Sequence, residues 1–477
     1  MARESGVLMS VSSLWGDYGI GSFGQEARQF VDALAQGGFS CWQVLPLCPV
    51  DEYNSPYKSF SSFGGNWFYV DLPTLAREGL LTPQELNGER QQGEYLCEYP
   101  RLHARRFEVL RKAADRVANR RPIEEFCLAR PQVDAFCRFM ALRHANADRP
   151  WQEWSCQEAD PRELFAWRFS QYCFFTQWQA LKEYANARGV ALMGDLPIYV
   201  SPDSADVWQD PDLFLLDERG YPAQEAGVSP DYFCAEGQRW GNPLYRWDRM
   251  RRDGFAWWRR RIAHAGTLFD RVRLDHFRAL ESYWAIPADA KSAREGKWKK
   301  GPGMPMVKAL QEAAGKDVQI VAEDLGDITP AVRRLVEKSG FCGMRVFQFG
   351  FLPGDNAWHR PHNYPAHCVA YSGTHDNNTL LGFLWECAPQ ERRDMLAYCG
   401  HSGPWEQGLD SMIRTLFASH ADQIVLPIQD LLGFGSDTRL NTPGRAENNW
   451  AYRLTQSQFQ ALDWPHWRRL NQLYGRA

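Results

Sequence analysis

The sequence predicts a (β/α)8 barrel, and three observations lead to this fold class. Short, continuous apolar segments recur along the 477 residues and end at or near Pro, Gly, Asp or Glu. Segments with helical periodicity separate several of them. Acidic residues stand where several of these segments end. Apolar strands that alternate with helices are typical of a buried parallel sheet, and eight such strands fit a closed barrel.

The eight expected strands share a run of apolar residues bounded by turn-forming residues. We place them at residues 6–10, 40–45, 190–195, 272–275, 319–323, 344–348, 368–371 and 423–428.

Two of the intervening helices have recognisable ends. After the first strand, Ser22-Phe-Gly-Gln25 has the form of a capping box, and Gly37-Gly38 ends the helical pattern. After the fifth strand, Thr329 and Pro330 occupy the N-cap and first helical positions, and Gly340 ends the helix. Both segments are therefore expected to be barrel helices.

The spacing of the strands is uneven. Roughly 145 residues separate the second strand from the third and roughly 75 the third from the fourth, whereas a plain barrel has about 30 residues per unit. We therefore expect one catalytic barrel over residues 1–477 with large insertions after strands 2 and 3. Residues 77–161 are predicted to form a helical subdomain on the C-terminal face, with helices at 101–119 and 123–145. Residues 200–250 are predicted to form a substrate-binding loop region, whose aromatic residues are Trp208, Tyr221, Tyr232, Phe233, Trp240 and Tyr245.

Composition excludes several classes of protein. With 54 Lys+Arg against 58 Asp+Glu the net charge is −4, so nucleic acid and membranes are not expected partners. A hydrophobic content of 44% excludes a disordered chain. The N-terminal residues do not resemble an export signal, no run of about 18 apolar residues occurs, and the 12 cysteines contain no C-x-x-C pair. We therefore expect a cytoplasmic protein with free thiols.

Aromatic residues are abundant, with 20 Trp against 18 Tyr. Flat rings with one polar edge suit stacking against sugars or bases, and they also fill cores. Composition alone leaves both interpretations open.

Four carboxylates stand at or just past predicted strand ends: Asp195, Asp275, Glu323 and Asp376. Catalytic residues of this fold gather at that end of the barrel. Like charges crowded there lower the stability of the fold, so a cluster of four indicates a functional site.

Two of these carboxylates differ in their expected protonation. Arg273 precedes Asp275 by two positions, so both side chains point to the same side of a strand and the cation favours the ionised Asp275. Glu323 has apolar neighbours such as Val321 and Leu325, which favour a raised pKa and the role of an acid. An ionised carboxylate opposite a protonated one is what glycoside chemistry requires.

Two competing motifs are weaker. Gly19-Ile-Gly-Ser-Phe-Gly24 matches the dinucleotide pattern, but it begins about nine residues after the predicted strand and no acidic residue follows at the required distance. His359, His362 and His367 lie in a loop segment rich in Pro, Asn and Tyr, with no Cys or carboxylate at ligand spacing. We therefore expect a tight turn and a solvated loop at these places.

The sequence also resembles the 4-α-glucanotransferase family, known as amylomaltases or disproportionating enzymes, over nearly its whole length. The matching stretches are Ser5-Gly-Val-Leu, Tyr18-Gly-Ile-Gly, Trp42-Gln-Val-Leu-Pro-Leu, Ser55-Pro-Tyr-Lys-Ser-Phe-Ser-Ser-Phe, Gly194-Asp-Leu-Pro-Ile-Tyr-Val, Gly237-Gln-Arg-Trp-Gly-Asn-Pro, Arg273-Leu-Asp-His-Phe-Arg, Ala322-Glu-Asp-Leu-Gly, Ser372-Gly-Thr-His-Asp-Asn and Arg439-Leu-Asn-Thr-Pro-Gly. It departs from the family at Cys48 and at Cys234 in Cys-Ala-Glu-Gly, near the expected acceptor loop.

The resemblance implies a retaining transferase that acts on α-1,4-glucans and needs no metal or organic cofactor. It implies that Asp275 is the nucleophile, that Glu323 is the general acid and base, and that Asp376 is the third carboxylate, which binds the sugar. It also implies substrate-binding residues around the same subsite and on the acceptor side, namely Tyr57, Asp195, Arg273 and His375 together with Gln238, Trp240 and Asn242.

Two other functions stay open on the sequence. A hydrolase resembling α-amylase would share the barrel and the three carboxylates, and a non-catalytic glucan-binding protein would share the aromatic residues. For the retaining mechanism we expect the carboxyl groups of Asp275 and Glu323 to lie about 5–5.5 Å apart.

Overall fold

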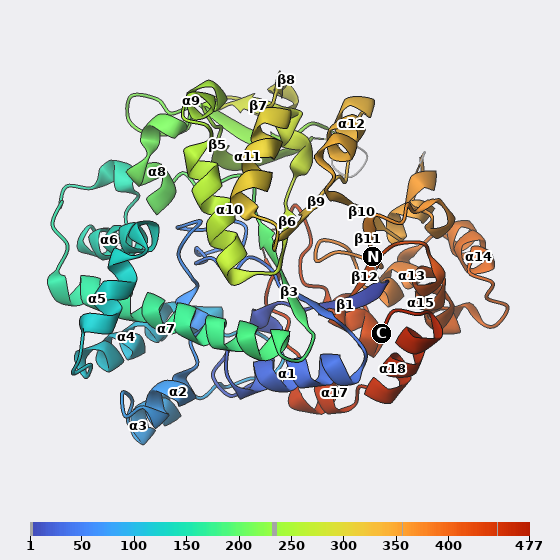
Figure 1. The fold of residues 1–477 in the computed structure, drawn as a ribbon, viewed down its shortest axis with the longest axis horizontal. Helices are drawn as coiled ribbons and strands as arrows, with labels where there is room; N and C mark the ends of the chain where they lie inside the picture. Colours follow the sequence, from blue (N-terminus) through green and yellow to red (C-terminus); the bar gives the residue numbers. More distant parts are fainter. Residues whose placement is uncertain (1–2, 231–235, 355, 446) are drawn as a thin grey trace.

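A computed structural model describes residues 3–230, 236–354, 356–445 and 447–477, and its centre is a closed barrel of eight parallel strands (Figure 1). Around the barrel the strands are β1 (Glu4–Leu8), β2 (Cys41–Gln43), β3 (Ala191–Leu196), β6 (Arg271–Leu274), β9 (Gln319–Ala322), β10 (Cys342–Val346), β11 (Cys368–Tyr371) and β12 (Gln423–Pro427). All eight strands expected from the sequence are present, each within a few residues of its expected position. The predicted fold class is therefore confirmed.

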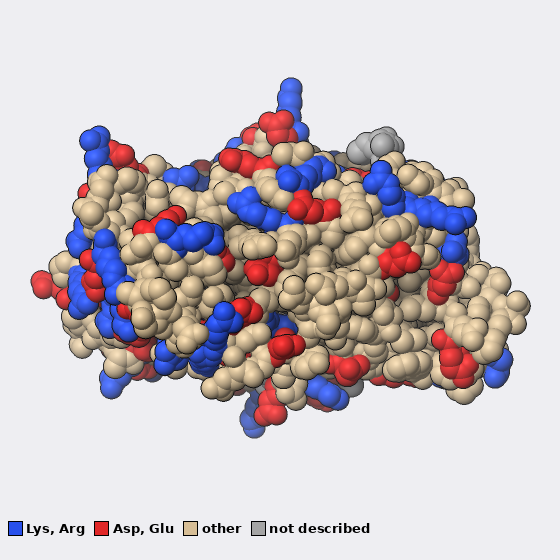
Figure 2. All heavy atoms as spheres, turned by 90° about the horizontal axis from the view of Figure 1, so that it is seen from below, with Lys and Arg blue, Asp and Glu red and all other residues tan. Residues whose placement is uncertain are grey.

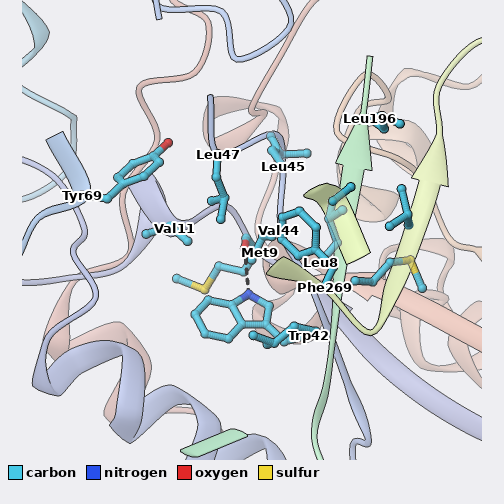
Figure 3. Packing of buried hydrophobic residues seen from close by; sticks show 14 of the residues in the cluster. Leu8, Met9, Val11, Trp42, Val44, Leu45, Leu47, Tyr69, Leu196 and Phe269 are labelled. Carbon is cyan, nitrogen blue, oxygen red and sulfur yellow. Dashed lines mark hydrogen bonds between the residues drawn. The ribbon is translucent and has the colours of Figure 1, made fainter. Parts of the chain in front are cut away.

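Small residues let the barrel close tightly. A Cβ atom on Gly6 of β1 would lie 2.8 Å from the Cβ atom of Cys41 on β2, and one on Gly194 of β3 would lie 2.2 Å from the Phe269 ring. Glycine at these two positions allows the strands and the buried ring to approach. Figure 3 shows the adjoining core, where the buried Trp42 indole donates a hydrogen bond to the carbonyl oxygen of Met9 at 2.9 Å.

Helices cover the barrel. Those that follow β1, β3, β6 and β9 are α1 (Gln25–Gln36), α8 (Ala205–Gln209), α9 (Trp247–Arg252), α10 (Ala256–Leu268), α11 (Met304–Ala314) and α12 (Pro330–Ser339). Those that follow β11 and β12 are α13 (Leu380–Glu386), α14 (Pro389–Tyr398), α15 (Leu409–Ala418), α16 (Ile428–Leu432), α17 (Gln456–Gln460) and α18 (Trp464–Leu473).

The two predicted helix starts have different outcomes. The side chain of Thr329 accepts a hydrogen bond from the Val332 amide, and Gly340 ends α12 in the left-handed conformation, as predicted. The capping box at Ser22 is wrong: α1 starts after Gly24 without a side-chain cap, and the Ser22 hydroxyl donates instead to Asp71 at 3.1 Å.

The segment between β2 and β3 is helical and extends to one end of the molecule (Figure 1). It contains α2 (Leu72–Arg77), α3 (Pro83–Gly88), α4 (Tyr99–Asp115), α5 (Arg121–Leu128), α6 (Pro131–Ala145) and α7 (Pro161–Asn186). The single helix expected at 123–145 is two helices, because Pro131 starts a new helix at a position where its missing amide hydrogen costs nothing. The treatment of 77–161 as a separate subdomain stays a prediction.

A second sheet was not predicted. Its four antiparallel strands, in the order β5-β4-β7-β8, are β4 (Gln224–Val228), β5 (Gln238–Pro243), β7 (Ser282–Pro287) and β8 (Lys297–Lys300). It joins the segment after β3 to a hairpin after β6, so residues 200–250 contain strands as well as loops. Tyr232, Phe233 and Cys234 lie outside the described residues.

The surface carries both charges. Figure 2 shows Lys and Arg interspersed with Asp and Glu across one face, consistent with the small net charge. No helix in the described ranges has the length and apolar character needed to cross a membrane. The 11 described cysteines are all unpaired.

Candidate active site

Strand register brings the predicted site residues to one end of the barrel. Asp195 on β3 pairs with Arg273 on β6, and Leu274 pairs with Ala322 on β9. Asp275 and Glu323 therefore follow directly after two adjacent strands. His375 and Asp376 lie in the turn that follows β11.

Arg273 connects two of the carboxylates. Its guanidinium contacts Asp195 Oδ2 at 2.6 Å and Asp275 Oδ1 at 3.0 Å, and only 5% of its side chain is exposed. Burial opposes the charge, but the two carboxylates outweigh it and raise the pKa of Arg273 well above its usual value. Arg273 is therefore a permanent cation that lies in contact with both Asp195 and Asp275.

Tyr57 and His375 extend this network to Asp376. The Tyr57 hydroxyl donates to Asp195 Oδ2 at 2.6 Å, and its ring stacks on the His375 ring with centroids 5.0 Å apart. His375 Nε2 lies 3.2 Å from Asp376 Oδ2. The structure thus brings together Tyr57, Asp195, Arg273, Asp275, His375 and Asp376.

Glu323 lies in a different environment from the other carboxylates. The residue is 8% exposed, and it accepts hydrogen bonds from the backbone amides of His276 (2.7 Å) and Leu325 (2.9 Å). Burial is the largest influence; together with the negative charge of Asp275, and against the opposing charge of Arg273, it raises the pKa of Glu323 to about 7. A carboxyl group with this pKa carries a proton in a large fraction of molecules at neutral pH.

His276 determines how Glu323 is held. It follows Asp275 in the chain and adopts a left-handed conformation, with φ of 48°, which is uncommon for a residue with a side chain. This conformation directs its amide to Glu323 Oε2. The strained residue therefore lies between the two central carboxylates.

Asp376 is held ionised by its neighbours. Burial opposes ionisation, but the charge and hydrogen bond of His375 and a hydrogen bond from Asn441 lower the pKa of Asp376 to about 2. Asn441 Nδ2 donates to Asp376 Oδ1 at 2.5 Å, and Arg439 donates to the Asp376 carbonyl oxygen at 2.6 Å. The Asp376 side chain is 45% exposed, so a ligand can reach it.

The predicted acceptor residues all lie on β5. The Trp240 ring packs edge-on against the His276 ring at 5.1 Å, and its indole donates to Gln238 Oε1 at 3.1 Å. Asn242 is buried and donates to the Val200 carbonyl oxygen at 2.8 Å. Trp240 therefore lies beside His276, the residue that follows Asp275, and holds Gln238 next to it, whereas the Asn242 side chain ties β5 to the loop that follows β3.

Other residues shape the site without having been predicted. Asn441 and Arg439 belong to a stretch that carries the family resemblance, but nothing in the sequence placed them at Asp376. Trp450, with φ of 64°, packs 5.8 Å from the Tyr57 ring and 5.9 Å from the His375 ring. These residues come from the C-terminal part of the chain, and only the three-dimensional structure brings them here.

Trp208 lies in a different environment. Its ring packs 6.0 Å from both Phe139 of α6 and Trp154, in a cluster formed with the helical insertion.

Within the described residues, no group of three or more His, Cys, Asp or Glu side chains could hold a metal ion.

The arrangement provides three carboxyl groups with separate properties. One is ion-paired with a buried arginine, one has a pKa near neutrality, and one is ionised and accessible. An ionised carboxylate near a protonated one matches what retaining glycoside chemistry requires.

Known proteins that are similar to this chain share one described activity. Residues 9–458 match the protein family described as 4-alpha-glucanotransferase. A 4-alpha-glucanotransferase from Thermus thermophilus is 41% identical over 485 residues, covering 95% of each chain. One from Streptococcus pneumoniae is 39% identical over 475 residues, covering 96% of this chain and 94% of that one.

Solved structures give the same result. The amylomaltase from Streptococcus agalactiae in complex with acarbose has a TM-score of 0.94 and 34% identity, and the match covers 100% of both chains. The amylomaltase from Corynebacterium glutamicum, at 17% identity, has a TM-score of 0.82 over 99% of this chain and 75% of that one, which shows that the two share a fold.

Proposed function

Since the chain belongs to the 4-alpha-glucanotransferase family, we propose that it transfers an α-1,4-glucan segment to the 4-hydroxyl of glucose or of another α-1,4-glucan by a retaining double displacement. The observation that carries this proposal is the contrast between Glu323, whose pKa is about 7, and the Arg273-paired Asp275. One group is suited to donate a proton and the other to attack.

In the first half-reaction Glu323 donates its proton to the glycosidic oxygen of the leaving glucan. Asp275 attacks the anomeric carbon and forms a covalent glycosyl ester while that bond breaks. The guanidinium of Arg273 contacts the Asp275 carboxylate, and its second ion pair, to Asp195, fixes the guanidinium in place. We expect the two carboxyl groups to lie about 5–5.5 Å apart, since the nucleophile must reach the carbon directly.

Asp376 accepts hydrogen bonds from the sugar hydroxyls. Its low pKa keeps it ionised, so it also stabilises the positive charge that develops on the sugar ring. Tyr57 and His375 form a stacked pair beside it, against which a glucosyl ring can pack. The S. agalactiae relative binds acarbose, and we expect this chain to bind acarbose at the same residues.

In the second half-reaction Glu323, now ionised, takes a proton from the incoming hydroxyl as that oxygen attacks the anomeric carbon and releases Asp275. Transfer and hydrolysis differ only in whether this hydroxyl belongs to a glucan or to water. Trp240, which packs against His276, and Gln238, which accepts a hydrogen bond from the Trp240 indole, bind the acceptor chain and exclude water.

Incubation with maltotriose tests this function. Transfer yields glucose together with longer maltooligosaccharides, and the number of reducing ends stays constant. Hydrolysis by an enzyme resembling α-amylase would raise that number with each cleavage. Release of reducing ends in step with cleavage would overturn the proposal in favour of the hydrolase.

Variants assign the chemistry to named residues. Asp275→Asn and Glu323→Gln conserve shape and should abolish disproportionation of maltotriose while the circular dichroism spectrum stays unchanged. Unchanged glucose release in either variant would contradict the assignment.

A further inference from the structure

An exposed tryptophan lies at the outer edge of the same end of the barrel. Trp385 is in the last turn of α13, the helix that follows Asp376, and 49% of the residue is exposed. Its ring packs against Gly435, where an added Cβ atom would lie 2.6 Å from the six-membered ring. Glycine at this position therefore lets the indole lie against the loop backbone.

Polar groups flank the ring. Asp437 is exposed, and its Oδ1 would lie 3.3 Å from the same added Cβ atom on Gly435, so this carboxylate and the indole are neighbours. Glu386, next to Trp385 in the chain, is exposed and accepts a hydrogen bond from the Ser436 hydroxyl at 2.9 Å. An apolar ring beside carboxylate acceptors complements a glucosyl unit, which has an apolar C–H face and a rim of hydroxyl donors.

The segment under the ring is continuous with the active site. Ser436, next to Gly435, accepts a hydrogen bond from Asn378 at 2.9 Å, two residues beyond Asp376. Farther along the same segment, Asn441 donates to the Asp376 carboxylate. One short stretch of chain, residues 435–441, therefore contacts Trp385 at one end and Asp376 at the other.

We propose that Trp385, with Asp437 and Glu386 beside it, forms an outer subsite that binds a distal glucosyl unit of a long α-1,4-glucan donor. This inference rests on the proposed function and extends it to the choice of donor. A short donor occupies only the positions at the carboxylates. A longer one continues along residues 435–441 and stacks on the indole, so it binds more tightly.

Donors of two lengths test the proposal. Trp385→Ala is expected to lower kcat/KM for transfer from maltoheptaose to glucose by about three- to tenfold, the contribution of one aromatic contact, and to leave transfer from maltotriose unchanged. Trp385→Tyr keeps a flat ring and should restore most of the loss. An equal loss with both donors, or no loss with either, would overturn the subsite.

A matched control and a binding measurement separate this proposal from the function on which it rests. Leu128→Ala removes another exposed apolar side chain, 82% exposed on α5, and should change neither donor. In a Glu323→Gln background, calorimetry should show that Trp385→Ala weakens maltoheptaose binding by the same three- to tenfold and does not change maltotriose binding. Equal maltoheptaose affinity of Glu323→Gln and of the double variant with Trp385→Ala would contradict the subsite. Failure of the proposed function would appear differently, as the absence of transfer from maltotriose in the unmodified protein.

Discussion

Replacing Glu323 by glutamine should make the protein more stable at high pH while removing its activity. The reason is the raised pKa of this buried carboxyl group, about 7 in the folded protein against its ordinary value of 4.5. Between these two values the folded protein holds a proton that the unfolded chain has released. The contribution of Glu323 to the free energy of unfolding is therefore highest below pH 4.5, falls as the pH rises towards about 7, and stays low above it.

The size of the effect follows from the same two pKa values. At about 1.4 kcal/mol for each pH unit, burial of ionised Glu323 lowers the free energy of unfolding by about 3 kcal/mol at pH 8. The glutamine side chain cannot ionise, but it replaces one carboxyl oxygen by an NH2 group, which cannot accept a hydrogen bond. One of the two backbone N–H groups that donate to Glu323 therefore loses its acceptor, at a cost of about 1 kcal/mol. The net gain at pH 8 is about 2 kcal/mol. With an unfolding entropy of about 1 kcal/mol/K for 477 residues, Tm should rise by about 2 °C.

Differential scanning calorimetry at two pH values measures this effect. Glu323→Gln should unfold about 2 °C above the unmodified protein at pH 8 and about 1 °C below it at pH 4.5, where only the lost hydrogen bond counts. Glu218→Gln, at an exposed glutamate, is the control and should show no such change of sign. The same difference in Tm at both pH values would refute the reasoning.

Three further predictions follow from the geometry. The value of kcat/KM for transfer from maltotriose should fall about tenfold per pH unit above pH 7, because Glu323 loses the proton that it donates; a flat profile to pH 9 would exclude it as the acid. Arg273→Met should lower the free energy of unfolding by about 3–5 kcal/mol in urea titrations, since it leaves the fully buried Asp195 side chain without its cation. Adding Asp195→Asn to the same chain should recover part of this loss. If the losses of the two single variants add up in the double variant, the pair does not interact. Gly194→Ala should lower the free energy of unfolding by about 1–3 kcal/mol, because the added methyl group overpacks against the Phe269 ring. Phe269→Leu in the same chain should recover part of this loss. A Gly194→Ala variant with unchanged stability would contradict the close approach.

The barrel was predictable because its strands are continuous apolar runs. All eight were expected within a few residues, and the Thr329 cap and Gly340 end of α12 were confirmed because they depend on neighbouring residues alone. Ser22 satisfied the same local pattern, yet its hydroxyl bonds to Asp71, which lies 49 residues away. Local patterns fail where a distant residue competes for the same polar group.

The second sheet and part of the site depend on distant pairings of this kind. β4 pairs with β7, which lies more than 50 residues farther along the chain, and neither strand has a strong alternating pattern of its own. The strand-end position of Asp195, Asp275 and Glu323 followed from the barrel, whereas the contacts of Asn441 and Trp450 depend on how the C-terminal segment returns across the site.

The central claim is that Asp275 forms a covalent bond to the sugar, and mass spectrometry of the trapped intermediate tests it most directly. In Glu323→Gln, α-glucosyl fluoride can still react, because fluoride leaves without an acid, but the second half-reaction lacks its base and the ester should accumulate. Peptic digestion at low pH should then yield a peptide that contains Asp275 and carries one additional glucosyl group. A glucosyl group on a peptide that contains Asp376, or turnover of the fluoride with no labelled peptide, would contradict the mechanism.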